Sequence, residues 1–567
     1  MTITATLLCQ LGMTITCLPA GSVMHMPTLA STALVAAVAF FMAVLLELLT
    51  EYVFDYGPLT ANGLLLIAIF LFAVSVLSFF YPVIANDGRV AFKYPTLAVM
   101  GFAELTVILL SKKVKPAFGL SKFDWKEPGN VFLLLCLIIG IALCIILPHE
   151  TVLNFDDETH YKDSISFSQG LYTVTDDADV RLFCWFWDKE PGLTVAERTE
   201  SDAALNAAVY NGNLYVDANR RAYDLRNIGY IGTAAGIWLG NALGLPATAR
   251  FTLARIGCMA LYAVLMSLAI KRLKSGKILL FLIGINPYAV YSAACFNYDA
   301  WMLSMTALGF ACFLGALQRP EEKLTTREII IMLGALALGI LPKTPYIPLL
   351  LIPFLMPRDK FANEKQRKRF YLALCLLILA LVVYTLIYTF GSGDPVDDRS
   401  NEQGNVSGIG QLTYILSNPF GYLEMLLGFL FRDTVPTVGY LTTFVYLGNT
   451  NTFIILTMAM AAVAVTDNSG IYKSSIATRI LGIVFLLAAL MLAATSMYMV
   501  FTPVGAATIN GCQSRYTVHL LFPFFMFALN GFIQWNPPRR IYNPVFYALG
   551  TGVLLFNIYK LVILPGL

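Results

Sequence analysis

The fold class follows from the stretch "NVFLLLCLIIGIALCIILP" at residues 130–148, which carries no charged side chain. At about 1.5 Å per residue in a helix, a run of this length nearly crosses the roughly 30 Å hydrocarbon core of a bilayer. The block "NFDDETHYKDS" follows at residues 154–164, with three consecutive acids and a histidine. A dense group of titratable side chains therefore stands just beyond the end of an expected membrane helix.

Apolar runs of this kind occupy most of the chain. Of its 567 residues, 58% are hydrophobic and only 13% are charged, whereas soluble proteins carry roughly 25% charged residues. Long or nearly long enough runs lie near 28–50, 63–82, 95–110, 130–148, 251–270, 278–293, 300–317, 371–390, 479–501, 517–534 and 544–563, and shorter ones near 229–245, 328–342, 345–356 and 453–465. The sequence predicts an all-α polytopic membrane protein with roughly 13 to 15 membrane segments.

Charge and cysteine usage exclude other classes. The net charge of +3 comes without a Lys/Arg-rich tail, so nothing indicates a nucleic-acid partner. The ten cysteines show no paired spacing, and most lie inside apolar runs, where cysteine acts as a small hydrophobic residue. We expect neither a disulfide framework nor a zinc site.

Basic loops predict the orientation of the chain. Lys and Arg are frequent at residues 111–122, 271–277, 358–369 and 537–540, which places these loops in the cytoplasm. Alternation then places 149–228, 391–451 and 502–516 outside. This scheme requires that 229–245 is not a full span. Its glycines at 232, 236, 240 and 244 predict a helix with one smooth face, suited to close packing against the bundle.

The runs and loops predict three parts. Residues 1–125 form an N-terminal transmembrane module, residues 126–535 form a core with large outer loops at 149–228 and 391–451, and residues 536–567 form a C-terminal transmembrane helix. The first outer loop holds 15 Asp/Glu against seven Lys/Arg, in a chain that is net positive.

Acids at the start of that loop are the first of four candidate site features. Asp156, Asp157, Glu158 and His160 lie at the end of a membrane helix, where a carboxylate can serve as a general base. The same oxygens could hold Mg²⁺ or Mn²⁺, although no ligand spacing requires a metal. The alternative is a solvated helix end.

The second feature is Asp299 in "CFNYDAW", at the outer start of a membrane helix. An aspartate there meets the positive end of the helix, so capping alone is a sufficient alternative to a role in binding.

The third feature is "LPKTPYIPLLLIPFLMP" at 341–357, whose prolines at 342, 345, 348 and 353 interrupt a long apolar segment. Broken helices at membrane depth occur where the backbone lines a cavity. Lys343 sits at the break with Tyr346 nearby, which favours an anionic ligand. The alternative is a lysine that reaches toward the membrane surface.

The fourth feature is "GCQSRYTVH" at 511–519, with Arg515 just before a membrane helix and Gln513 and Tyr516 beside it. A guanidinium can bind two phosphate oxygens at once. An arginine that merely reaches the interface is the alternative.

In this order, the segments "DDETHYKDSISFSQG", "YIGTAAGIWLGNALGL", "NPYAVYSAACFNYDA", "LPKTPYIPLLLIPFLMP" and "TPVGAATINGCQSRYTVHLLFPF" resemble a bacterial multi-pass membrane family, domain of unknown function 2142. The resemblance covers about residues 130 to 535. Asp157, Glu158 and His160 match its Asp-Glu-x-x-His element with one residue fewer before the histidine. Asp156 stands where proline is common, and Ser514 where glycine is common.

The family is similar in layout to the GT-C glycosyltransferases, which implies transfer of a sugar from a polyprenyl-phosphate carrier to a glycan, lipid or protein on the outer face. Asp157 would be the base, with Asp156 as its rival, and Lys343 and Arg515 would receive the phosphate. Two readings compete with this one: a secondary transporter, and a polymerase or ligase of lipid-linked oligosaccharides.

Aromatic and acidic side chains complete the expected site. Trp185 and Trp187 in the first outer loop, together with Asp299, would contact the sugar or the acceptor. Gln513, Tyr346 and Tyr516 would lie with the two cations around the donor phosphate.

Overall fold

The computed structural model describes residues 124, 126–147, 149, 157–168, 202–203, 206, 225–390, 404–434, 450–467, 475–530 and 538–558. The expected N-terminal module therefore lies outside the described residues, apart from residue 124. Asp156, Trp185 and Trp187 also lie outside them. Glu158 belongs to a described helix, but its side chain is not described.

The described part of the chain is helical, with no β-strand in it, as the apolar runs predicted. The longer helices are α5 (Pro128–Ile146), α10 (Ala247–Arg272), α13 (Asp299–Leu317), α14 (Thr326–Ile340), α15 (Glu364–Phe390), α19 (Thr450–Thr466), α20 (Ile476–Phe501) and α22 (Arg539–Ile558). The shorter ones are α6 (Asp157–Ser168), η3 (Leu225–Tyr230), α9 (Ile231–Ala242), α11 (Lys277–Gly284), α12 (Pro287–Ala293), η4 (Leu341–Leu355), η5 (Arg358–Lys360), α16 (Gly408–Ser417), α17 (Pro419–Gly428), η7 (Phe429–Thr434), η9 (Ser514–Thr517) and α21 (Val518–Ala528).

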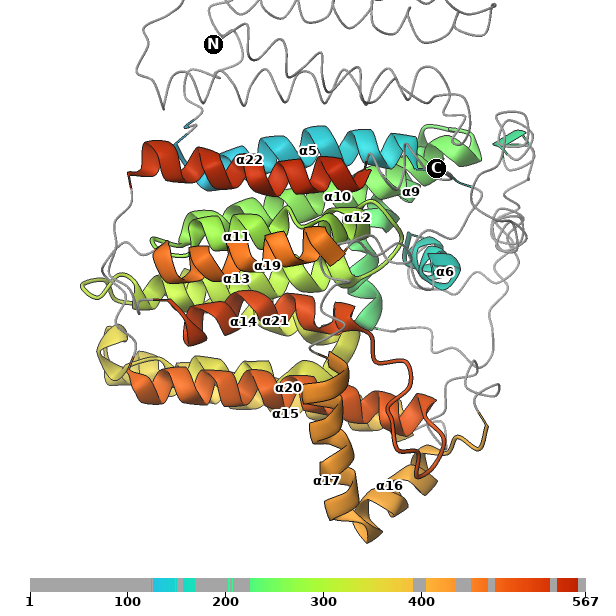
Figure 1. The fold of residues 1–567 in the computed structure, drawn as a ribbon, viewed down its shortest axis with the longest axis vertical. Helices are drawn as coiled ribbons and strands as arrows, with labels where there is room; N and C mark the ends of the chain where they lie inside the picture. The colour runs from blue at the N-terminus through green and yellow to red at the C-terminus, as the bar shows by residue number, and fades with distance from the viewer. Residues whose placement is uncertain are drawn as a thin grey trace, which may run out of the picture.

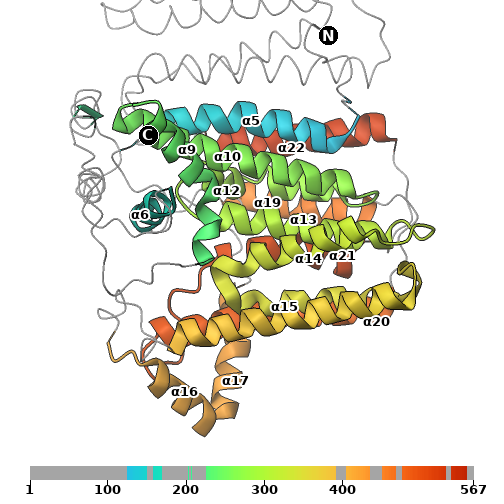
Figure 2. The ribbon, with the colours of Figure 1, turned by 180° about the vertical axis from the view of Figure 1, so that it is seen from behind.

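Seven stretches of these helices are long and apolar enough to cross a membrane. They lie side by side in one bundle (Figure 1), and the view from behind shows α15 and α20 together on one flank (Figure 2). α13 forms the centre, with 94% of its most apolar window buried, whereas only 17% of that window is buried in α15. Leu372, Leu379 and Ile387 on α15 are more than half exposed. Because this exposed surface is apolar, it is suited to lipid rather than water.

The segment with four prolines turns the chain back on itself. α14 ends at Ile340, and Lys343 then leaves the helical conformation at φ −134° and ψ 83°. η4 returns along α14, so that the backbone carbonyl of Lys360 accepts a hydrogen bond from the amide of Leu324, where α14 begins. At about 2.0 Å per residue, the 3-10 turns of η4 span roughly 30 Å. The expected break at Lys343 is confirmed, and it separates two passes through the bundle.

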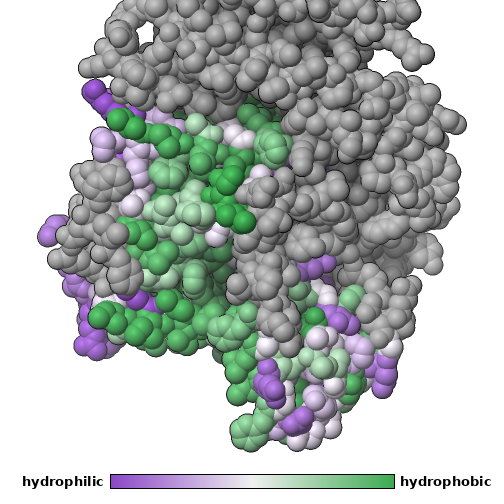
Figure 3. Space-filling model, viewed as in Figure 1, coloured by the Kyte–Doolittle hydropathy of each residue, from purple (hydrophilic) through white to green (hydrophobic). Residues whose placement is uncertain are grey.

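Described basic loops gather at one end of the bundle, as expected. Lys271, Arg272, Arg358 and Arg539 lie at helix ends that hydrogen bonds and an ion pair connect to one another, and this side is called here the basic end. Figure 3 shows hydrophilic side chains there and hydrophobic ones over the middle of the bundle. The loop at 111–122 lies outside the described residues. The opposite end, where Lys343 lies, is called the Lys343 end.

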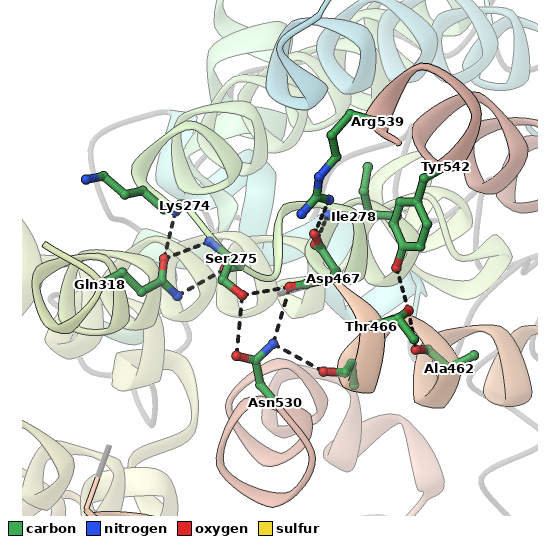
Figure 4. Close-up of polar contacts among 11 residues, drawn as sticks. Lys274, Ser275, Ile278, Gln318, Ala462, Thr466, Asp467, Asn530, Arg539 and Tyr542 are labelled. Atoms are coloured by element: carbon green, nitrogen blue, oxygen red, sulfur yellow. Dashed lines mark hydrogen bonds and ion pairs between the residues drawn. The ribbon is translucent and has the colours of Figure 1, made fainter. Parts of the chain in front are cut away.

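A buried polar network ties the basic end together (Figure 4). Asp467, at the end of α19, is 1% exposed; its carboxylate pairs with Arg539 and accepts a hydrogen bond from the amide of Ile278. The amide oxygen of Gln318 accepts from the backbone of Lys274 and Ser275. These residues, with Asn530, are called the Asp467 network. It fastens the turn between α10 and α11 to the ends of α13, α19, α21 and α22.

Glycines pack α9 against α10, which confirms that residues 229–245 contain a short packed helix and not a full span. A Cβ atom on Gly236 would lie 2.2 Å from the backbone oxygen of Leu253, and one on Gly232 would lie 2.8 Å from the Cα of Cys258. Gly244 does not belong to this face. It adopts a positive φ of 63° in the turn after α9, with nothing near its missing side chain, so its role is to end the helix.

Candidate functional site

Four segments that are far apart in sequence meet at the Lys343 end. They are the start of α6, the junction between α12 and α13, the turn between α14 and η4, and η9 before α21. The residues called here the Lys343 cluster come from these segments: His160, Tyr298, Asp299, Lys343, Arg515, Tyr516 and His519. The sequence predicted that these features share one side of the membrane, and the structure brings them into contact.

Local sequence places each segment. Asn297 accepts hydrogen bonds through its side chain from the amides of Asp299 and Ala300, which fixes the first turn of α13. Pro342 and Pro345 flank Lys343 and keep it out of a regular helix. Asp299 thus begins its helix, as predicted, and also faces the other members of the cluster.

Lys343 is the central cation. Its Nζ atom lies 3.2 Å from the centroid of the Tyr516 ring and 5.4 Å from that of Tyr298, so the ammonium is held by aromatic faces. The Nζ atom is buried and has no hydrogen-bond partner in the described part of the chain. A buried ammonium without an acceptor is costly, and an anion bound beside it would remove that cost.

Arg515 and Asp299 form the buried ion pair of the cluster. Arg515 Nη1 lies 3.5 Å from Asp299 Oδ2, and the two residues are 5% and 8% exposed. The same carboxylate oxygen accepts a 2.9 Å hydrogen bond from the Tyr288 hydroxyl. Burial alone would lower the pKa of Arg515, but the charge of Asp299 outweighs it and raises that pKa well above its ordinary value. Asp299 therefore holds the guanidinium in place.

His160 connects α6 to this cluster. Its Nδ1 atom lies 2.7 Å from the Tyr230 hydroxyl, and its ring meets the Tyr298 ring edge-on at 5.1 Å. Burial raises the pKa of Tyr230 well above its ordinary value, and the negative charge of Asp163 acts in the same direction. Tyr230 therefore stays protonated, and the tautomer of His160 sets which of the two donates in their hydrogen bond.

Asp157 lies in the first turn of α6 and contacts the junction between α12 and α13. Its carboxylate is fully buried and accepts a 3.0 Å hydrogen bond from the amide of Phe296. Phe296 belongs to a small buried apolar group that also includes Tyr161 and Phe251. The carboxylate thus fastens α6 to the junction that carries Asp299, because a charged group in such a position needs a donor to remain buried.

The remaining residues of these segments are of two kinds: some hold the cluster in place, and others carry a buried polar atom without a hydrogen-bond partner among the described residues. Tyr346 is fully buried; its hydroxyl donates to the backbone oxygen of Tyr516, and its ring meets His519 edge-on at 4.3 Å. It supports the cluster and does not offer its hydroxyl to a ligand. In the described residues, Gln513 Oε1, Ser514 Oγ and His519 Nε2 are buried without a hydrogen-bond partner. These three atoms lie on one segment with Arg515.

No set of three His, Cys, Asp or Glu side chains that could hold a metal ion occurs among the described residues. A site for Mg²⁺ or Mn²⁺, the alternative that the sequence left open, would need ligands from Asp156 and Glu158, whose side chains are not among those described. The Lys343 cluster holds two cations, one carboxylate, hydroxyl groups and imidazole rings, and this excess of positive charge suits an anion better than a divalent cation.

Tyr230, Tyr298 and His519 are members of the site that sequence reasoning did not select. Each lies within a segment that drew attention for another residue: Tyr230 opens the glycine-rich helix α9, Tyr298 precedes Asp299, and His519 follows Arg515 by one turn. These residues could have been found in the sequence as polar or aromatic side chains at the start of otherwise apolar helices at the Lys343 end.

Comparison with known proteins gives one match. No curated protein and no solved structure matches this chain. The model of a family described as predicted membrane protein, DUF2142, matches residues 190–528, which is more than half of the chain. The match includes Asp299, Lys343 and Arg515 but begins after α6, so the acid-histidine element lies outside it. The chain belongs to the DUF2142 family of membrane proteins.

Proposed function

We propose that this protein is a membrane glycosyltransferase of the GT-C type. It moves a hexose or pentose from a polyprenyl-phosphate carrier to a glycan, lipid or protein acceptor on the outer face of the membrane, in the synthesis of cell-envelope polysaccharide or a related surface glycan. The observation that carries the proposal is the buried ammonium of Lys343, which has no hydrogen-bond acceptor among the described residues and lies in one cluster with Arg515.

The cations match the charge that develops in such a reaction. The acceptor hydroxyl gives its proton to a carboxylate, and its oxygen bonds to the anomeric carbon with inversion. The bond from that carbon to the carrier oxygen breaks, and the phosphate leaves with the electron pair. Lys343 and Arg515 stabilise the negative charge on this phosphate, and the hydrogen-bonding groups of Gln513, Ser514 and His519 lie on the same segment as Arg515.

The base in this proposal comes from the acidic run at 156–158. Asp157 accepts from the amide of Phe296 and is fully buried, so it is better suited to positioning α6 than to reaching an acceptor hydroxyl. Asp156 and Glu158 flank it and are the candidates for the base. His160 then contributes through Tyr230 and Tyr298 rather than through a metal.

The assay uses the purified full chain and a panel of polyprenyl-phosphate sugars, with wild type compared with Lys343→Met and Lys360→Met. Lys360 is a matched control, because it is a mostly buried lysine at the basic end whose ammonium donates to the backbone oxygens of Arg319 and Glu322. We expect donor consumption in wild type and Lys360→Met and its loss in Lys343→Met.

Failure to consume any donor, with uptake of labelled solute into proteoliposomes, would favour the transporter reading. The base is identified separately with Asp156→Asn, Asp157→Asn and Glu158→Gln. Either Asp156→Asn or Glu158→Gln should abolish turnover without weakening donor binding. Asp157→Asn should mainly lower thermal stability. Loss of turnover in Asp157→Asn alone, with unchanged stability, would return the base to Asp157.

A further inference from the structure

α16 and α17 form an element that leaves the bundle at the Lys343 end. Figure 1 shows α17 running across the direction of α20, and α16 turning away from its outer part; the view from behind agrees (Figure 2). The two helices join at Asn418, whose side chain accepts from the amide of Gly421 and starts α17. They are not a further pass through the bundle.

One face of each helix is apolar and exposed. On α16 this face carries Ile409, Leu412 and Leu416, spaced by three and four residues. On α17 it carries Phe420 and Leu427, with Leu423 beside them; Phe420 is 85% exposed. A stripe with this spacing is the mark of an amphipathic helix.

The opposite face is fixed to the protein. Gln411 on α16 is fully buried, and its side-chain oxygen accepts a 3.1 Å hydrogen bond from the amide of Gly505. On α17, Tyr422 hydrogen-bonds Thr495 of α20 and contacts the ring of Tyr498. Tyr498 in turn donates to the backbone oxygen of Ala506. The segment held by these contacts, 502–513, leads directly to Arg515.

The contact with α20 gives the depth of the element. Thr495 lies six residues before α20 ends at Phe501, and at about 1.5 Å per residue this is roughly 9 Å below the end of a membrane helix. Interfacial helices bury their apolar face about 5–10 Å into the boundary between headgroups and acyl chains. α20, which α17 contacts, also exposes apolar side chains, including Val484 and Leu492.

Charge distinguishes the interface from the hydrocarbon core. Between Gly408 and Gly428 the single charged residue is Glu424, which lies on the exposed side of α17. A carboxylate is costly at the centre of a bilayer but is accepted near the headgroups, where water reaches it. An apolar stripe with one such acid suits a phospholipid surface better than bulk water or a dry protein interface.

We propose that α16 and α17 lie in the leaflet at the Lys343 end and bind phospholipid through the stripe from Ile409 to Leu427. Their other face then braces the segment 502–513, so that lipid contact and the position of Arg515 depend on one element. This inference does not rest on the proposed glycosyltransferase activity.

The test places the photoreactive amino acid p-benzoylphenylalanine at position 420 of the full-length protein in proteoliposomes of one synthetic phospholipid. Leu379, 58% exposed on the membrane-crossing helix α15, is the positive control. Glu322 in the loop before α14 is the negative control, because its side chain is 63% exposed at the basic end. After irradiation, the phospholipid adduct at each position is measured by mass spectrometry.

We expect an adduct yield at position 420 close to that at 379 and roughly tenfold above that at 322, as for an apolar face buried in the interface. A yield no higher than at 322 would overturn the proposal. Crosslinks from position 420 to a second copy of the chain, or to another protein when the experiment is run in native membranes, would overturn it as well, because they would show that protein covers this face.

Discussion

The Asp467 network and the Lys343 cluster are both polar groups buried in an apolar bundle, and they differ in how completely their members are paired. At Asp467 the two carboxylate oxygens have separate partners, and the side chains of Gln318 and Asn530 both donate and accept hydrogen bonds (Figure 4). At Lys343 the ammonium and the Nε2 atom of His519 have no hydrogen-bond partner in the described chain. In a structural site, each buried polar group has a hydrogen-bond partner within the protein. A buried polar group without such a partner is typical of a functional site, where a bound ligand supplies the missing hydrogen bond.

The largest effect is expected when Lys343 is replaced by an apolar residue. Lys343→Met should lower the rate of sugar transfer by roughly a hundredfold, the cost of removing one group that stabilises developing charge. It should leave thermal stability equal or higher, since a buried charge without an acceptor is replaced by an apolar chain of similar size. Transfer is measured with a radiolabelled donor, and unfolding by differential scanning fluorimetry.

Lys360→Met provides the reverse pattern in the same measurements. It should keep transfer and lose about 1–3 kcal/mol of stability, because the carbonyls of Arg319 and Glu322 lose a charged donor. If both substitutions lower stability to the same extent and leave transfer unchanged, Lys343 has a structural role like that of Lys360, and the proposed difference between the two ends of the bundle is wrong.

Asp299→Asn tests the ion pair between Asp299 and Arg515 in the Lys343 cluster. Removing the charge leaves Arg515 buried without its carboxylate, which commonly costs about 3–5 kcal/mol. Transfer should fall mainly through a higher KM for the donor, because Arg515 is no longer held in position. A double substitution with Arg515→Met should recover stability but not transfer. Recovery of transfer would contradict a role for Arg515 in donor binding.

Asp467→Asn is the corresponding test of the Asp467 network at the basic end. It weakens the pair with Arg539, which is about one-third exposed, so we expect a loss of about 1–3 kcal/mol and no change in donor affinity. Chemical denaturation in detergent measures the first quantity and donor titration the second. A change in donor affinity would show that the Asp467 network is coupled to the other end.

The smallest effect is expected for Gln411→Ala, which removes the acceptor for the amide of Gly505. The cost should be near 1 kcal/mol, and it should appear locally as faster hydrogen exchange in 502–513. Thr413→Ala on the exposed side of α16 is the matched control, and its exchange should equal that of wild type. Faster exchange throughout the bundle would contradict a local brace.

Several parts of the site followed from the sequence because they depend on local rules. The prolines around Lys343 predicted a break, and the break is present. The basic loops predicted a common end, and the described ones share it. The hydrogen bond from the amide of Phe296 to Asp157 did not follow, because it depends on the junction between α12 and α13, more than 100 residues away.

The sequence by itself determined the membrane class, the helical architecture and the sorting of charge to the helix ends, since each of these depends on composition and on spacing along the chain. Only the tertiary structure decided which charged side chains are paired. Asp299 and Arg515 are 216 positions apart, and Lys343 lies on a third segment against Tyr516. The energy of a buried charge depends on its neighbours in space, and no local pattern records them.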